Sequence, residues 1–101
     1  MEANNIQRRC KGFDWDKGNE QKNWLLYHVK KVEAEQVFFN HPLIIFDTYT
    51  QNNEKRYLAL GVTNKGRLLT IVFTIRKNNL IRVISARDMS RKERSSYESK
   101  S

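Results

Sequence analysis

The chain has 101 residues, which allows one compact domain and leaves no room for a second. Its 19 Lys and Arg exceed its 11 Asp and Glu, so the formal charge of +8 favours an anionic partner: nucleic acid, a membrane surface or an acidic protein. The single cysteine, Cys10, excludes an intramolecular disulfide and a four-thiolate zinc site, and it favours a reducing, cytoplasmic location.

The sequence gives no sign of membrane targeting. Its N-terminus lacks the cationic start and apolar run of a signal peptide, and the apolar stretch 68–75 is far shorter than the roughly 20 residues that span a bilayer. We therefore expect no membrane partner.

The chain begins with an arm and a short strand. Residues 1–11 show no periodicity and carry three cations, which predicts a flexible basic N-terminal arm followed by a single domain over 12–98. Residues 13–15 alternate apolar and polar side chains, as a short strand does, and Asp16 can cap the helix that follows.

Two helices are predicted next, over 19–28 and 32–39. The buried stripe expected for the first consists of Trp24, Leu25 and Tyr27 or His28. The stripe expected for the second consists of Ala34, Val37 and Phe38, spaced for one helical face. Pro42 ends this second helix, because proline disfavours helix in the residue before it.

Four strands joined by polar turns are predicted after Pro42. They span 43–47, 56–63, 67–76 and 80–87. The third is the clearest, because its alternate residues from Leu69 to Ile75 are apolar while the other face is partly polar. Gly66, in the turn before it, can take a positive φ.

A final helix is predicted from Ser90 to about Tyr97, because Ser90 and Glu93 have the spacing of a capping box. The element order is therefore β-α-α-β-β-β-β-α. Consecutive strands joined by short turns predict an α+β fold, an antiparallel sheet with flanking helices.

The positive charge is concentrated in the second half of the chain. Residues 1–40 carry seven cations and six carboxylates, whereas residues 41–101 carry twelve and five, a net charge of +7. A localised basic field suggests a binding site, although cations that only decorate a solvent-exposed face would give the same count.

Four arginines on the last two predicted strands are the main site candidates. Pairing these strands brings Arg76 near Arg82 at one end and Arg67 near Arg87 at the other. Guanidinium groups bind phosphate oxygens with forked donors, and RNA cleavage by the 2′-hydroxyl needs such a cation beside groups that move protons. The alternative is structural ion pairing with Asp47, Glu54, Asp88 or Glu93, which we expect for Arg87 with its neighbour Asp88.

The aromatic residues divide into expected surface and core groups. Tyr57 and Tyr97 are candidates for stacking on bases. The predicted core aromatics are Trp15, Trp24, Phe38 and Phe73. The histidines are 13 residues apart without a nearby cysteine in ligand spacing, so no metal site is predicted.

Ordered motifs resemble those of the BrnT family of bacterial type II toxins. The first are Phe13-Asp14-Trp15-Asp16, Lys22-Asn23-Trp24 and Glu33-Ala34-Glu35-Gln36-Val37-Phe38. The later ones are Glu54-Lys55-Arg56-Tyr57, Gly66-Arg67-Leu68-Leu69, Thr74-Ile75-Arg76, Ile84-Ser85-Ala86-Arg87, Glu93-Arg94 and Tyr97. Each motif is weak alone, and it is their joint order that makes the resemblance specific.

The resemblance implies a RelE-like fold and a ribonuclease that arrests growth, needs no metal or other cofactor, and is neutralised by a cognate antitoxin. That antitoxin is expected to be a DNA-binding ribbon-helix-helix protein, which forms a dimer or heterotetramer with the toxin and binds operator DNA. Under the resemblance, Arg67, Arg76, Arg82 and Arg87 match the family's basic positions and would bind phosphate, and with Tyr27 and His28 they are the catalytic candidates. The RNA-binding candidates, which the charge pattern and the aromatic residues supply, are Lys65, Lys77, Tyr57, Arg94 and Tyr97.

One local departure from the family concerns proton transfer. The family commonly has Lys-His before a small residue and valine at the end of its first helix, where this chain reads Leu26-Tyr27-His28-Val29. Tyr27 therefore stands where the family has histidine, and His28 is shifted by about 100° around the helix. Two alternatives stay open: a non-catalytic basic module that binds nucleic acid or an acidic protein, and a toxin that has lost activity but keeps its antitoxin contact.

Overall fold

The computed structural model describes residues 10–100. Most of the predicted basic arm, residues 1–9, lies outside this part of the chain. The elements are β1 (Gly12–Phe13), α2 (Lys17–Tyr27), α3 (Lys31–Phe39), β2 (Leu43–Tyr49), β3 (Lys55–Val62), β4 (Leu68–Ile75), β5 (Leu80–Asp88) and α4 (Arg91–Lys100). The predicted order of elements is confirmed, and no helix among these residues is long and apolar enough to cross a membrane.

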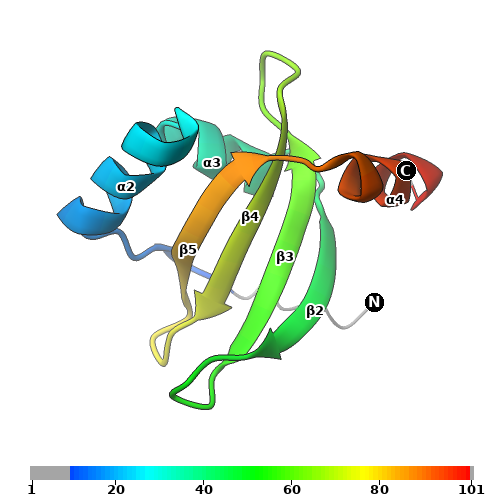
Figure 1. The fold of residues 1–101 in the computed structure, drawn as a ribbon. Helices are drawn as coiled ribbons and strands as arrows, with labels where there is room; N and C mark the ends of the chain where they lie inside the picture. The colour runs from blue at the N-terminus through cyan, green and yellow to red at the C-terminus, as the bar shows by residue number, and fades with distance from the viewer. Residues whose placement is uncertain (1–9, 101) are drawn as a thin grey trace.

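The sheet has the order β1-β5-β4-β3-β2 (Figure 1). Strands β2 to β5 form an antiparallel meander, as short turns between consecutive strands predict. The short strand β1 pairs in parallel with β5, placing Phe13 opposite Ile81, so the sheet as a whole is mixed.

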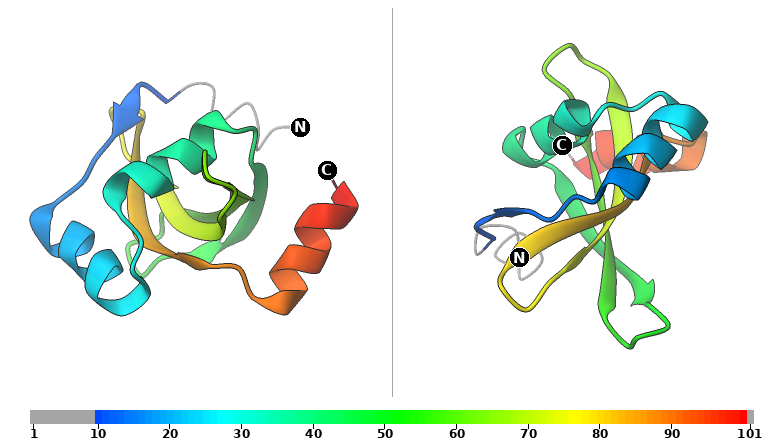
Figure 2. Two further views of the ribbon diagram at one scale, coloured as in Figure 1. Left: turned by 90° about the horizontal axis from the view of Figure 1, so that it is seen from above. Right: turned by 90° about the vertical axis from the view of Figure 1, so that its left-hand side faces the viewer.

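The three helices occupy different positions around the sheet (Figures 1 and 2). Seen from above, the sheet curves around α3, while α4 projects on the other side. Helix α2 lies along β5 at the edge of the sheet. The core lies between α3 and the sheet, where Phe38 meets Phe73 edge to face with ring centroids 5.0 Å apart.

Local signals in the sequence explain the ends of the helices. Asp16 accepts a hydrogen bond from the backbone N–H of Asn19, 2.7 Å away, and caps α2 as predicted. Ser90 and Glu93 form the predicted capping box of α4, with reciprocal bonds of 3.1 and 2.8 Å. The turn glycine Gly66 has φ +90°, also as predicted.

The predicted buried stripe of α2 is right for Tyr27, which is half-buried against the core, and wrong for Trp24 and Leu25. The side chains of Trp24 and Leu25 are 46% and 72% exposed, whereas Asn23 is 2% exposed. The reason is that α2 packs on the outer edge of β5, where backbone polar groups need partners. Asn23 Oδ1 accepts from the Ala86 N–H, and the side chains of Asn19 and Lys22 donate to carbonyls of β5.

The core aromatics are partly as predicted. Phe38 and Phe73 are buried, and Ala34 and Val37 confirm the predicted face of α3. Trp15 is half-buried and donates to Glu35, 2.8 Å away. Tyr57, which was predicted to be exposed, is instead buried and stacks on Phe73, because its register on β3 places it on the face that α3 covers.

Candidate active site

The end of α2, the start of β4, the end of β5 and the start of α4 meet at one edge of the molecule. We call the residues gathered there the junction cluster: Tyr27, Arg67, Arg87, Asp88 and Glu93. They come from sequence positions far apart, and the antiparallel register, which sets Leu69 opposite Asp88 and Thr70 opposite Arg87, brings them together.

Arg67 connects three elements. Its Nε and Nη2 bind the carboxylate of Asp88, with an Nε–Oδ1 distance of 2.8 Å. Nη1 donates to the carbonyl of His28 and Nη2 to that of Tyr27, at 2.8 and 3.1 Å. Nη1 also pairs with Glu33 of α3 at 3.3 Å. Each of its three nitrogens therefore donates to a protein oxygen.

Arg87 forms a forked ion pair with Glu93. Nη1 and Nη2 of Arg87 bind the two carboxylate oxygens of Glu93 at 2.7 and 2.8 Å. Glu93 also accepts from the hydroxyl of the buried Thr70 at 2.9 Å. The hydrogen bond from Arg87 is the main reason that the pKa of Glu93 falls to about 2, with smaller contributions from the Ser90 backbone and from Thr70.

Arg87 forms an ion pair, as expected, but its partner is Glu93 and not the expected Asp88. Neighbouring side chains on a strand point to opposite faces, so Arg87 turns toward α4 while Asp88 turns toward Arg67. The contact that Arg87 makes with Asp88 is a hydrogen bond of 3.3 Å to its backbone carbonyl and does not involve its carboxylate.

The two proton-transfer candidates differ in their surroundings. Tyr27 is half-buried against the core, and its hydroxyl adds a small electrostatic contribution to the pKa of Arg87, which Glu93 raises most. His28 is exposed and takes a left-handed conformation with φ 54° at the end of α2. Its ring stands edge-on to Trp24, with centroids 5.3 Å apart. The structure thus brings the backbone carbonyls of Tyr27 and His28 into contact with Arg67 of the junction cluster.

Three further predicted cations lie at the other end of the β4–β5 hairpin. We call Arg76, Lys77 and Arg82 the turn cluster. Arg82 stands opposite Thr74, four residues along β4 from the partner of Arg87, which corresponds to about 13 Å. The predicted sites of cleavage and binding therefore fall into two groups.

Both arginines of the turn cluster have acidic partners. Arg76 pairs with Glu54 at 3.3 Å, and Arg82 pairs with Asp14 at 3.5 Å and with Asp16. The Asn19 backbone and then Arg82 hold the pKa of the Asp16 carboxyl below its usual value.

The remaining RNA-binding candidates are dispersed. Lys65 is exposed in the β3–β4 turn, at the opposite end of β4 from Lys77. Arg94 pairs with Glu98 at 3.5 Å along α4, and Tyr97 is half-buried on the same helix. The burial of Tyr57 between Phe46 and Phe73 leaves it no open face for a base.

No group of three or more His, Cys, Asp or Glu side chains within residues 10–100 could hold a metal ion.

Sequence reasoning missed Glu33, and it named Glu93 only as one of four carboxylates that could pair with an arginine, without singling it out as the partner of Arg87. Glu33 follows Lys30 by three residues and caps α3 through the Lys30 backbone N–H, a spacing that was visible in the sequence. Its contact with Arg67 depends on how α3 meets β4, and no local pattern carries that information.

Comparison with known proteins gives a consistent result. The family described as "Ribonuclease toxin, BrnT, of type II toxin-antitoxin system" matches residues 15–93. The crystal structure of the Brucella abortus ribonuclease toxin BrnT superposes with a TM-score of 0.57 at 18% identity, covering 79% of this chain and 97% of that one. At this identity the structural likeness concerns the fold alone. No match was found among curated proteins.

Proposed function

The chain belongs to the BrnT family of ribonuclease toxins of type II toxin-antitoxin systems, and we propose that it cleaves RNA at the junction cluster without a metal ion. The observation that carries this assignment is the geometry of Arg87. A half-buried guanidinium, held by both carboxylate oxygens of Glu93, provides a fixed positive charge in the same cluster as Tyr27, a residue whose side chain can transfer a proton.

The reaction consists of attack by a 2′-hydroxyl on the adjacent phosphorus. A base removes the hydroxyl proton as the new P–O bond forms, and an acid protonates the 5′-oxygen as its bond to phosphorus breaks. Arg87 neutralises the charge that grows on the non-bridging oxygens. Tyr27 and His28, at the end of α2, are the groups that move the two protons.

Arg67 has a positioning role in this proposal. Its nitrogens already bind Asp88, Glu33 and the carbonyls that end α2, so it fixes the backbone of Tyr27 and His28 and does not bind phosphate. The turn cluster and the exposed Lys65 then bind flanking phosphates of the same RNA, together with Arg94, and Tyr97 is the remaining aromatic for a base.

The test is cleavage of a labelled single-stranded RNA by the purified protein with EDTA present. Replacing Arg87 by alanine should lower the rate by roughly 100-fold or more, because one transition-state donor is lost. Arg56→Ala is the matched control, since Arg56 also sits on a strand in a hydrogen-bonded ion pair, with Asp47 at 2.7 Å, but lies outside both clusters. Circular dichroism must show that each variant is folded.

Equal rates for wild type, Arg87→Ala and Arg56→Ala would remove the junction cluster from the mechanism. Cleavage that EDTA abolishes and Mg²⁺ restores would overturn metal independence.

A second candidate function is a toxin that binds its partners without turnover. It is favoured by the fork between Arg87 and Glu93, because both outer nitrogens of the guanidinium are occupied and RNA must displace a carboxylate to reach them. RNA binding with steep salt dependence but no cleavage would support this alternative.

The protein partner in this proposal is a cognate antitoxin with a ribbon-helix-helix DNA-binding domain, and the complex is a cytoplasmic heterotetramer that binds operator DNA. Co-expression with the neighbouring open reading frame tests this: a stable complex with the mass of two copies of each chain is expected. A monomeric toxin that does not co-purify with that product would contradict it.

A further inference from the structure

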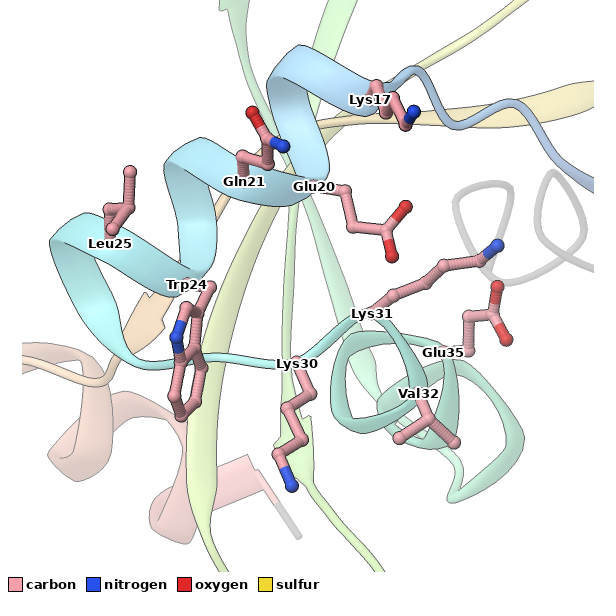
Figure 3. A pocket seen from close by; sticks show the side chains of 9 residues that line it. All are labelled: Lys17, Glu20, Gln21, Trp24, Leu25, Lys30, Lys31, Val32 and Glu35. Carbon is pink, nitrogen blue, oxygen red and sulfur yellow. The ribbon is translucent and has the colours of Figure 1, made fainter.

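Residues of helices α2 and α3 line a common groove, and some of them are exposed apolar side chains (Figure 3). The groove has a volume of about 890 Å³, and Trp24 and Leu25 of α2 and Val32 of α3 contribute its apolar surface. Val32 is 53% exposed. Exposed apolar side chains gathered on neighbouring elements mark an interaction surface more often than isolated ones do.

The fold does not need these side chains. Helix α2 contacts β5 through Asn19, Lys22 and Asn23, and α3 contributes Ala34, Val37 and Phe38 to the core. Among residues 10–100, the outward faces of both helices therefore take no part in packing on the sheet, and they are free to bind a partner.

Three lysines and two glutamates, Glu20 and Glu35, border the apolar surface, so the lining has a net positive charge. Lys17, Lys30 and Lys31 line the groove, and the ammonium of Lys30 lies 6.0 Å from the centre of the Trp24 ring. Of the two carboxylates in the lining, Glu35 already accepts the indole N–H of Trp15. An apolar floor with a cationic border is complementary to a segment that has both apolar and acidic residues.

We propose that this groove is the docking surface for an acidic amphipathic helix of the cognate antitoxin, an inference that rests on the proposed function. A groove between two helices accepts the apolar face of a third helix. A second copy of the chain would bring another charge of +8 to a cationic surface, so charge complementarity favours the acidic partner.

Docking here also explains how the antitoxin reaches the catalytic residues. Trp24 contacts the ring of His28, and the carbonyl of His28 binds Arg67. A helix that buries Trp24 covers the end of α2 and blocks access of RNA to the junction cluster, while the ion pair of Arg87 stays intact.

The experiment measures binding of the purified cognate antitoxin by calorimetry to wild-type toxin, to the double variant Leu25→Asp/Val32→Asp, and to Leu26→Asp. Leu26 is the matched control, because it is a 62% exposed leucine on the same helix but does not line the groove. The double variant should bind at least about 100-fold more weakly. Leu26→Asp should stay within about threefold of wild type.

RNA cleavage by the free variants separates this inference from the proposed function. The double variant should cleave RNA at the wild-type rate yet resist neutralisation by the antitoxin. If wild type does not cleave RNA, the proposed function fails, whereas the affinity comparison still reports on the groove. Equal affinities of wild type and the double variant would overturn the docking site.

Charge reversal tests the acidic character of the partner. Lys30→Glu/Lys31→Glu should weaken antitoxin binding and flatten its salt dependence, while Lys92→Glu on α4 should leave both unchanged.

Two other results would overturn the assignment of the antitoxin as the occupant of the groove. The first is a dimer of the toxin alone that Leu25→Asp/Val32→Asp dissociates, and the second is a groove occupied by residues 1–9, detected as increased acrylamide quenching of Trp24 after their deletion.

Discussion

Individual arginines of this protein perform different tasks, and their neighbours decide which. Arg67 lies just before strand β4, yet it supplies the positive charge at the C-terminus of α2, a helix with no basic residue in its own last turn. Arg87 binds one carboxylate, that of Glu93, with both outer nitrogens of its guanidinium. The first arrangement builds the site, whereas the second can exchange a carboxylate for a phosphate.

Glu93 should make stability depend on pH in the acid range. Its pKa falls from 4.5 to about 2 on folding, so its contribution is complete above pH 4.5 and is lost as the pH falls toward 2. Glu93→Gln should therefore lower the free energy of unfolding by up to about 3 kcal/mol at pH 7 and by much less at pH 2.5. Urea unfolding at both pH values measures this difference.

Glu98→Gln is the control for this pH effect. Glu98 pairs with Arg94 on the exposed face of α4, where both side chains are more than 60% exposed, so its replacement should change stability little at either pH. If Glu93→Gln lowers the free energy of unfolding by the same amount at pH 7 and at pH 2.5, the ionised carboxylate does not have the stabilising role assigned to it.

The sequence predicts some of these contacts and misses others. The capping box of Ser90 and Glu93 is local, and its spacing is enough to predict it. The contacts of Glu93 with Thr70 and Arg87 depend on where α4 meets the sheet, which no spacing in the sequence states.

At the level of elements, α2 replaces a missing strand. Beyond its pairing with β1, the outer edge of β5 has no neighbouring strand among residues 10–100, and three polar side chains of α2 bind its backbone. This arrangement turns the polar side of the helix inward and its apolar side outward. It therefore satisfies the sheet edge and creates the exposed groove at the same time.

Replacing Asn23 by alanine tests how much the contact between α2 and the edge of β5 contributes to stability. The Ala86 N–H would lose its acceptor in a buried site, which should cost roughly 1 to 3 kcal/mol of unfolding free energy. Thermal unfolding measures this loss, and Gln21→Ala, on the exposed side of α2, is the control. Equal stability of the two variants would show that the Asn23 contact is dispensable.

Gly61 tests the packing of α3 on the sheet. A methyl group added there would lie 2.9 Å from Cγ1 of Val37 and 3.3 Å from Cβ of Pro42, so Gly61→Ala should destabilise the fold by roughly 1 to 3 kcal/mol. Gly12→Ala, whose methyl group would meet only Leu80 at 3.6 Å, should be close to neutral in the same urea titration. Combining Gly61→Ala with Val37→Ala should recover part of the loss, and purely additive effects would exclude the steric cause.

The order of elements was predictable because strands, turns and caps leave local patterns. The orientation of α2 was not, because a buried asparagine and an outward tryptophan invert the usual hydrophobic pattern. The run Trp24-Leu25-Leu26 was nevertheless a usable signal, since three consecutive helical residues cover about 200° and cannot all face the core.

At the scale of the whole molecule, the cations of the second half divide into those with carboxylate partners and those without. All four arginines of the predicted site have carboxylate partners, so their charge is largely compensated locally. Within residues 10–100, the cations of the second half that form no ion pair are Lys55, Lys65, Lys77, Arg91, Lys92 and Lys100. If the proposed function is right, these exposed cations, and not the arginines alone, should produce the field that attracts RNA.

The salt dependence of RNA binding should therefore report on these exposed cations. With an uncleavable 2′-O-methyl RNA, Lys77→Ala should reduce the slope of log K against log salt by about 1, because one phosphate contact is lost. Lys17→Ala should leave the slope unchanged, since Lys17 lines the groove between α2 and α3. If Lys17→Ala instead lowers the slope as much as Lys77→Ala does, RNA and the antitoxin share one surface, and the separation of the two sites is wrong.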